Sequence, residues 1–230
     1  QKAAELQRAV AEQNQVEQAT SPTPTIRPRA EIVQAELSTN QRVVINAPAI
    51  DGSINLKGSR IDDVSLKNFY ETIQDKEAKR AAGEIKLLSP EGTERAFVAT
   101  VAWGNAGFFS DDVVWSQTNT GPLTPENPLK LQFANADLRI DRTISIDSDY
   151  MFVIADVLTN LGAAPLTVQP SAQVRQRLLP EHTTTPVSEQ QAHRGALGVY
   201  GAEKNQQINY HDLSQGKAVS KIVTGGWNAL

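Results

Sequence analysis

Histidines are the residues of this sequence best suited to acid–base or metal chemistry, and there are three of them: His182, His193 and His211. Both kinds of site need a second histidine or a carboxylate at a spacing that brings the two groups together. No histidine here has such a neighbour, because Asp212 beside His211 would point to the opposite face of a strand. The sequence therefore favours structural or surface roles for all three.

Paired carboxylates are the second candidate, and they occur at Asp62–Asp63, Asp111–Asp112 and Asp147–Asp149. Neighbouring side chains on a strand diverge, so the first two are poor acid–base pairs, although a loop could bring the second pair together. The third resembles the start of a calcium-binding loop but lacks its glycine and its distal glutamate. We expect a plain turn at Asp147–Asp149.

Other chemical signatures are missing from the sequence. Without cysteine the chain can form no disulfide, thiolate metal site or cysteine nucleophile. It contains no nucleophile elbow, phosphate loop or dinucleotide-binding motif. The spacing of Gly195, Gly198 and Gly201 suits strand crossings or tight turns. We therefore expect a binding or structural module that is not an enzyme, with no catalytic residue, no cofactor and no metal.

The aromatic residues allow two interpretations. Trp103, Trp115 and Trp227 could form a platform on which a sugar stacks, but in a β domain with few aromatic residues they more often fill the core or its edge. Phe108 and Phe109 could contact a partner, although a buried loop anchor is the simpler role. Packing is the favoured role in both cases.

Composition argues against two classes of partner. The 230 residues carry 22 Lys and Arg against 26 Asp and Glu, a net charge of −4, whereas nucleic acids and anionic membranes attract a basic face. No apolar run approaches the ~20 residues of a membrane-spanning helix. The longest run, Tyr150–Leu158, is interrupted by Asp156.

The N-terminal residues differ in composition from the rest. Gln1–Thr20 is rich in Ala, Gln and Glu with a sparse apolar stripe, and the prolines of Ser21–Arg29 favour extended chain. We interpret residues 1–41 as a connector, partly helical or disordered, and residues 42–230 as the folded domain. A helix that docks on a partner is the alternative for the connector.

From residue 42 onward the apolar period becomes two, which indicates β-strands. Leu129–Phe133 alternates apolar and polar residues, and Leu138–Ile146 does the same with Arg142 as the one polar residue on the apolar face. Tyr150–Leu158 is apolar on both faces, which predicts a central strand. The polar turn at Asp147–Asp149 would join the last two strands into a hairpin.

Further strand candidates recur at spacings of roughly 10–20 residues with Gly, Pro and Asn between them, which is typical of an all-β protein. They are Val43–Ala47, Ile54–Leu56, Val64–Leu66, Ile85–Leu88, Phe97–Val101, Leu166–Val168, Leu197–Tyr200, Ile208–Tyr210 and Val219–Val223. Tyr70–Ala82, rich in Glu, Lys and Ala, is predicted as a helix or a charged loop. The sequence thus predicts one mainly β, sandwich-like domain with minor helix.

Several stretches, in order along the chain, resemble the large periplasmic domain of the YidC membrane-protein insertase family. They are Gly52–Asp63, Ile85–Thr93, Gly121–Pro125, Arg142–Asp147 with Tyr150–Phe152, His193–Val199 and Gly225–Trp227. Each motif alone is weak, but six in this order over roughly residues 42 to 227 make a specific match.

The resemblance implies more than the residues themselves show. It implies a β-supersandwich of the galactose-mutarotase-like type at the periplasmic face of the bacterial inner membrane, joined to the membrane only through flanking helices absent from this chain. The implied partners are SecD–SecF, the SecYEG translocon and nascent inner-membrane proteins, and not nucleic acid. Insertion in the family belongs to a downstream helical bundle. The family domain also continues past the Gly-Gly-Trp motif, so the chain to Leu230 is expected to be C-terminally incomplete.

The mutarotase-like fold raises an alternative from another class, a carbohydrate-binding module or an aldose epimerase. Fold alone does not decide function. An epimerase needs a base and an acid that face each other across a cleft, usually a histidine and a carboxylate, and no motif here places a carboxylate opposite a histidine.

Overall fold

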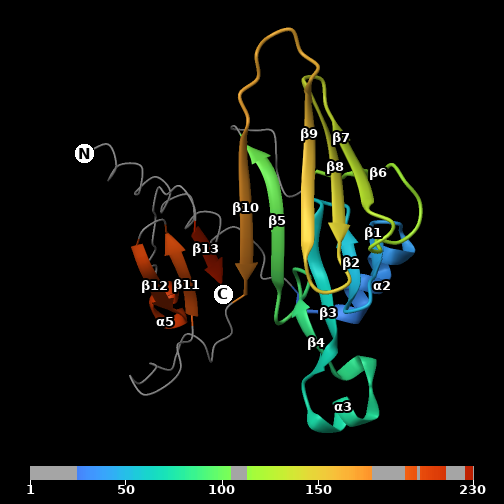
Figure 1. The fold of residues 1–230 in the computed structure, drawn as a ribbon, viewed down its shortest axis with the longest axis vertical. Coiled ribbons are helices and arrows are strands. Elements are labelled where there is room, and N and C mark those ends of the chain that lie inside the picture. Colours follow the sequence, from blue (N-terminus) through green and yellow to red (C-terminus); the bar gives the residue numbers. More distant parts are fainter. Residues whose placement is uncertain (1–24, 105–112, 178–194, 201–202, 216–225, 230) are drawn as a thin grey trace.

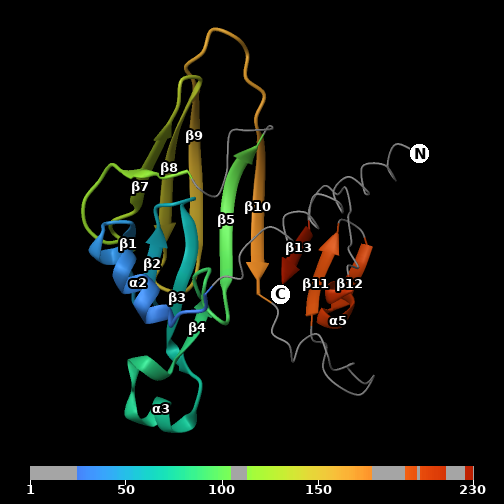
Figure 2. The ribbon, with the colours of Figure 1, turned by 180° about the vertical axis from the view of Figure 1, so that it is seen from behind.

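The computed structural model describes residues 25–104, 113–177, 195–200, 203–215 and 226–229, and these residues form antiparallel sheets with a few short helices (Figure 1). One sheet has the order β1-β2-β3-β5-β10, with β4 also paired to β3, and a second has the order β6-β7-β8-β9. These two sheets pack face to face as a β-sandwich. A third sheet, of order β12-β11-β13, lies beside β10 in both views (Figures 1 and 2).

The bounds of the elements follow the predicted strands closely over most of the sandwich. The strands are β1 (Arg42–Asn46), β2 (Ile50–Asn55), β3 (Arg60–Tyr70), β4 (Glu84–Leu88), β5 (Phe97–Gly104), β6 (Ser116–Gln117), β7 (Leu129–Ala134), β8 (Leu138–Ile146), β9 (Phe152–Asn160), β10 (Gln169–Gln176), β11 (Gly195–Tyr200), β12 (Glu203–Asn209) and β13 (Gly226–Ala229), and the helices are α2 (Arg29–Ser38), α3 (Ile73–Ala78), η1 (Ala81–Gly83) and α5 (Tyr210–Ser214). The prediction of a mainly β sandwich is confirmed.

The core lies between the two large sheets and is built from alternate residues of their strands. In β8 the buried and half-buried positions alternate over the full length of the strand, as the sequence pattern predicts. Ile140 and Ile144 are 0% exposed, and they meet Ile45 and Ile54 of the facing sheet in one apolar cluster. Period-two patterning therefore decides which face of each strand becomes core.

The predicted hairpin between β8 and β9 is confirmed. All nine residues of β8 pair with β9 without a register shift, from Leu138 opposite Asn160 to Ile146 opposite Phe152. The turn is closed by Asp147, whose Oδ1 accepts hydrogen bonds from the backbone N–H groups of Asp149 at 2.9 Å and Met151 at 3.0 Å. This carboxylate serves the turn, as an Asx residue commonly does.

β9 is not the central strand that the sequence predicts. Among the described residues it pairs only with β8, so it lies at the edge of its sheet. Its outward residues Val153 and Val157 are 56% and 64% exposed. The apolar outward face predicts a covered strand, but no described element covers it.

Two shorter predictions also need correction. Leu166–Val168 packs against the core but is irregular, and the strand begins only at Gln169. Tyr210 does not continue β12, because it starts α5, whose N-cap residue Asn209 accepts a hydrogen bond from the N–H of Asp212 at 2.8 Å. The predicted strand Val219–Val223 lies outside the described residues.

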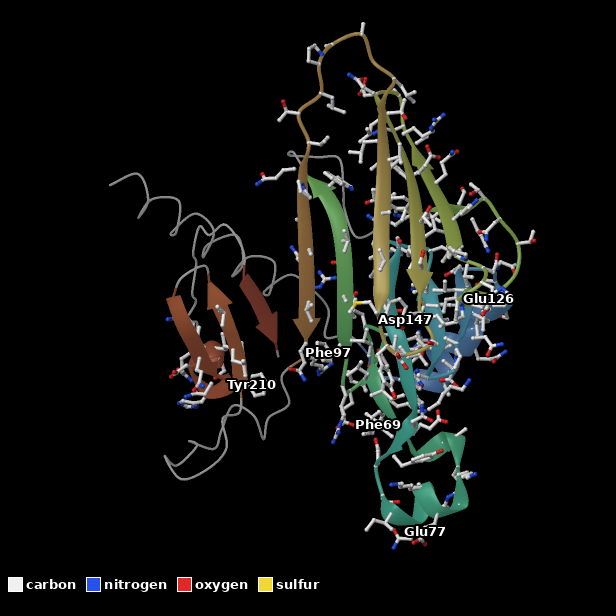
Figure 3. All side chains as sticks on the ribbon, in the orientation of Figure 1. Phe69, Glu77, Phe97, Glu126, Asp147 and Tyr210 are labelled. Carbon is white, nitrogen blue, oxygen red and sulfur yellow. The ribbon has the colours of Figure 1, made fainter. Side chains whose placement is uncertain are left out.

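The segment Tyr70–Ala82 contains both predicted alternatives, a short helix and irregular chain. Thr72 caps α3 by accepting a hydrogen bond from the N–H of Asp75 at 3.1 Å. None of the residues of α3 is buried, and the helix projects beyond one end of the sheets, where Glu77 is labelled (Figure 3).

Gly52 is the backbone position on which the pairing of β2 with β3 depends. Its φ is +140°, and a Cβ atom added there would lie 1.9 Å from the backbone oxygen of Asp63. Gly92 also has a positive φ, of +86°, but the nearest atom to an added Cβ would be 3.5 Å away. An alanine at position 92 would therefore meet only an unfavourable φ, whereas an alanine at position 52 would also collide with β3.

We expect Gly52→Ala to lower the free energy of unfolding by about 3 kcal/mol, because it adds a collision with a paired strand to an unfavourable φ. Gly92→Ala, which changes only the φ preference, should cost about 1 kcal/mol. Denaturant unfolding with an unchanged m-value would measure both. Equal costs for the two variants would contradict the close approach of β2 and β3.

Candidate functional site

The helix that organises this site, α2, lies within residues 1–41, which the sequence predicts as a partly helical or disordered connector, but its position and its attachment to the sheet were not predicted. It begins at Arg29, directly after Pro28, and lies on the outer face of the β1–β2–β3 part of its sheet, opposite the sandwich core (Figures 1 and 2). Ile32 is its only buried residue. One apolar side chain cannot hold a ten-residue helix that is marginal by itself, so polar contacts must supply the rest of its attachment.

Arg42 of β1 is the centre of those polar contacts. Its Nη1 donates to Asp62 Oδ1 at 2.6 Å and its Nη2 donates to Asp62 Oδ2 at 3.2 Å, which is a bidentate pair. Its Nε donates to Glu36 Oε2 of α2 at 2.6 Å. The Arg42 side chain is 0% exposed, so this guanidinium joins helix and sheet out of reach of water.

Asp63 makes the second link between α2 and the sheet. Its Oδ2 accepts a hydrogen bond from Ser53 Oγ at 2.6 Å, and its other carboxylate oxygen forms an ion pair with Arg29 Nη2 at the start of α2. The same Arg29 nitrogen donates to Ser65 Oγ at 3.1 Å. Arg42 Nη1 also reaches Ser53 Oγ at 3.3 Å, so both links belong to one network. We call the six residues Arg29, Glu36, Arg42, Ser53, Asp62 and Asp63 the α2 charged cluster.

A β-bulge explains how Asp62 and Asp63 enter the same cluster. The pairing of β2 with β3 runs from Ser53 opposite Asp63 to Ile54 opposite Ile61, which leaves Asp62 as an extra residue. The expectation that these two neighbours diverge holds for a regular strand and is wrong at this bulge. Both carboxylates are paired with arginine, and both residues are buried.

The electrostatics of the α2 charged cluster show a balance between desolvation and pairing. Burial raises the pKa of Asp62, and the hydrogen bonds from Arg42 act in the opposite direction. For Arg42, burial lowers the pKa, but Asp62 and Glu36 outweigh it and the net change is upward. Such a cluster adds little net stability, yet removal of one partner leaves a buried charge without compensation.

A second buried ion pair lies in the other sheet, where the sequence shows Arg142 as a polar residue on an apolar face. Its Nε and Nη2 donate to the two carboxylate oxygens of Asp156 at 2.8 and 2.7 Å. Trp103 Nε1 donates to Asp156 Oδ2 at 2.6 Å, and the guanidinium carbon of Arg142 lies 4.5 Å from the ring centroid of Trp115. The packing role predicted for Trp103 and Trp115 is confirmed.

The remaining residues singled out in the sequence do not assemble into a site within the described part of the chain. His211 lies in α5 and is half-buried. Asp111–Asp112, Phe108 and Phe109, and His182 and His193 lie outside the described residues, and the side chain of Trp227 is likewise not described. Among described residues, no three His, Asp or Glu side chains are grouped as a metal ion would require.

Comparison with known proteins gives the family of this chain. The family model described as the YidC periplasmic domain matches residues 42–230. The membrane protein insertase YidC of Nitrobacter hamburgensis is 38% identical over 198 residues, which are 83% of this chain and 31% of that protein.

The chain belongs to the YidC periplasmic domain family.

Two further relatives carry the same name, membrane protein insertase YidC. The protein of Bradyrhizobium diazoefficiens is 36% identical over 200 residues, 84% of this chain and 30% of its own length, and that of Methylorubrum extorquens is 36% identical over 205 residues, 83% and 32%. The chain thus spans about a third of the relatives' length. In the described residues no helix combines the length and apolar character needed to cross a membrane.

The YidC-like motif Gly52–Asp63 has a structural meaning in this fold. It supplies the close approach at Gly52, the bulge, and three members of the α2 charged cluster. The motif therefore encodes the surface to which α2 is attached.

We expect Asp62→Asn to lower the free energy of unfolding by about 3 kcal/mol, because it leaves Arg42 buried with Glu36 as its only carboxylate. Asp141→Asn is the matched control, since Asp141 pairs with Arg139 at 2.9 Å on the outer face of β8, where the two side chains are about 40% exposed. That variant should leave the denaturation midpoint almost unchanged. Similar midpoints for both variants would show that Arg42 does not depend on Asp62.

Proposed function

We propose that this chain is the periplasmic part of an insertase that inserts, folds and assembles inner-membrane proteins, with or without the Sec translocon. Its own role is to bind partners and to position them, without catalysis. The proposed partners are SecD–SecF, SecYEG and nascent inner-membrane proteins, at the periplasmic face of the inner membrane. Membership of the YidC periplasmic domain family over residues 42–230 carries this proposal.

The α2 charged cluster supports the positioning half of the proposal. Residues 1–41 are predicted to connect the domain to a membrane anchor, and α2 lies within that range. Because Arg29 and Glu36 fix both ends of α2 to the sheet, the connector joins the domain at a fixed place. The connector then limits how far the sandwich can move from the membrane surface.

The proposed binding of partners can be tested by photo-cross-linking in membranes that contain the intact insertase. A photoreactive residue is placed in turn at Val157 on β9, Lys130 on β7 and Glu77 on α3. The first two are exposed positions on the outer face of one sheet, and the third is exposed on the projecting helix. We expect at least one position to cross-link to SecD–SecF or to SecYEG, and the products should disappear when that partner is depleted. Cross-links from none of the three positions would overturn partner binding.

The absence of catalysis is tested by polarimetry. An aldose epimerase would accelerate the mutarotation of a pure glucose anomer, whereas a positioning domain has no base and acid arranged to do so. We expect the chain at micromolar concentration to leave the rate at that of buffer. Acceleration that disappears on heat denaturation of the chain would instead support the epimerase alternative.

A further inference from the structure

A cavity of about 510 Å³ lies where the chain enters α2, and the proposed partner binding does not involve it. The segment before and at the start of α2, strand β4 and the loop that leads to β5 form its walls. The cavity is lined by Ile26, Arg27, Pro28, Arg29, Glu71, Lys86, Ser89, Thr93, Glu94 and Arg95. Its volume is within the range of small-molecule sites, roughly 300–1,000 Å³.

The charge of the lining differs from that of the whole chain. Four lining residues are basic and two are acidic, whereas the chain as a whole has a net charge of −4. Two of the basic residues already have carboxylate partners outside the lining, since Arg29 pairs with Asp63 and Arg27 pairs with Glu31. The net charge argues against a broad basic face, and the cavity is a local exception to it. Lys86 and Arg95 have no carboxylate partner among the described residues, and such cationic groups in a concave site attract anions.

Several donors of the cavity remain available to a ligand. Arg95 is exposed and has no hydrogen-bond or ion-pair partner among the described residues. Lys86 donates from Nζ to the carbonyl oxygen of Ala81 at 3.1 Å, which leaves two ammonium hydrogens. Arg27 pairs with Glu31 at 3.6 Å, and both side chains are about half exposed, so this pair is weak.

Arg29 provides a fixed wall for the cavity. Its guanidinium is held by Asp63 of the α2 charged cluster and by the neighbouring Ser65, so its position is set before any ligand arrives. A ligand can first contact Arg29, and the more exposed donors Arg27, Lys86 and Arg95 can then move to bind it. A partly preformed site loses less entropy on binding than a fully mobile one.

We infer that this cavity binds a phosphate group carried on a small organic molecule. A phosphate monoester or diester presents several oxygens to separate donors, and guanidinium groups match its geometry. A carboxylate offers only two oxygens, both in one plane, whereas the four oxygens of a phosphate group are arranged tetrahedrally. Ile26, 43% exposed, and Pro28 line the same cavity, which gives the organic part an apolar wall.

Phosphate binding stabilises the attachment of α2. The ligand gives Arg95 and Lys86 an anionic partner beside the point where α2 begins. A ligand that binds only the folded state raises the free energy of unfolding as its concentration exceeds Kd. The shared chemistry fits a glycerophospholipid headgroup and a soluble phosphate ester alike.

The test uses the 230-residue chain, with glycerol 1-phosphate as the probe and glycerol as the uncharged control. We expect saturable heat release in calorimetry and a rise in Tm with glycerol 1-phosphate only. Arg95→Gln should raise Kd about tenfold, as loss of one charged hydrogen bond would. Lys130→Gln removes one positive charge from β7, away from the cavity, and should leave Kd unchanged.

Lack of saturable binding by the chain would overturn the inference, and so would equal weakening by Arg95→Gln and Lys130→Gln. Sedimentation with vesicles of phosphatidylglycerol in phosphatidylcholine then separates the two sources. Vesicle binding that glycerol 1-phosphate displaces supports the lipid headgroup, and soluble binding without vesicle binding supports a free phosphate ester. None of these measurements requires SecD–SecF or SecYEG, so their outcome is independent of the proposed partners.

Discussion

A guanidinium that water cannot reach must be surrounded by carboxylates, and this requirement governs the architecture around α2. Arg42 needs Asp62 from β3 and Glu36 from α2 at the same time, and both are within 2.6 Å of it. The helix therefore lies where Glu36 can be the second carboxylate partner of the buried Arg42 guanidinium. In this way a polar helix with one buried apolar residue becomes part of the fold.

The same requirement holds in the second sheet, with different partners. Arg142 is 1% exposed and combines Asp156 on the neighbouring strand with the face of Trp115. Asp156 in turn accepts from Trp103 of β5, so the pair connects the two sheets across the core. The sandwich thus contains two buried arginines. Arg42 lies on its outer side under α2, and Arg142 lies in the core between the sheets.

Sequence patterning predicts those parts of the fold that obey a regular period. The alternation along β8 predicts its buried face, and the turn residue Asp147 predicts the hairpin. The pattern could not predict α2, because its attachment is ionic and long-range, nor the convergence of Asp62 and Asp63, which needs a bulge. The buried Arg142–Asp156 pair, in contrast, could have been found from the sequence. Both are polar residues in apolar strands, and they are equally spaced about the turn that joins these strands.

The Arg142–Asp156 pair also decides the register in which β9 can fold. Because Tyr150–Leu158 is apolar on both faces, a slip of β9 by one residue would still bury apolar side chains and would cost little hydrophobic energy. The slip would, however, turn Asp156 outward and oppose Arg142 to an aliphatic residue. An unpaired buried cation costs about 3–5 kcal/mol, so a single ion pair excludes misaligned hairpins that the apolar pattern alone would accept.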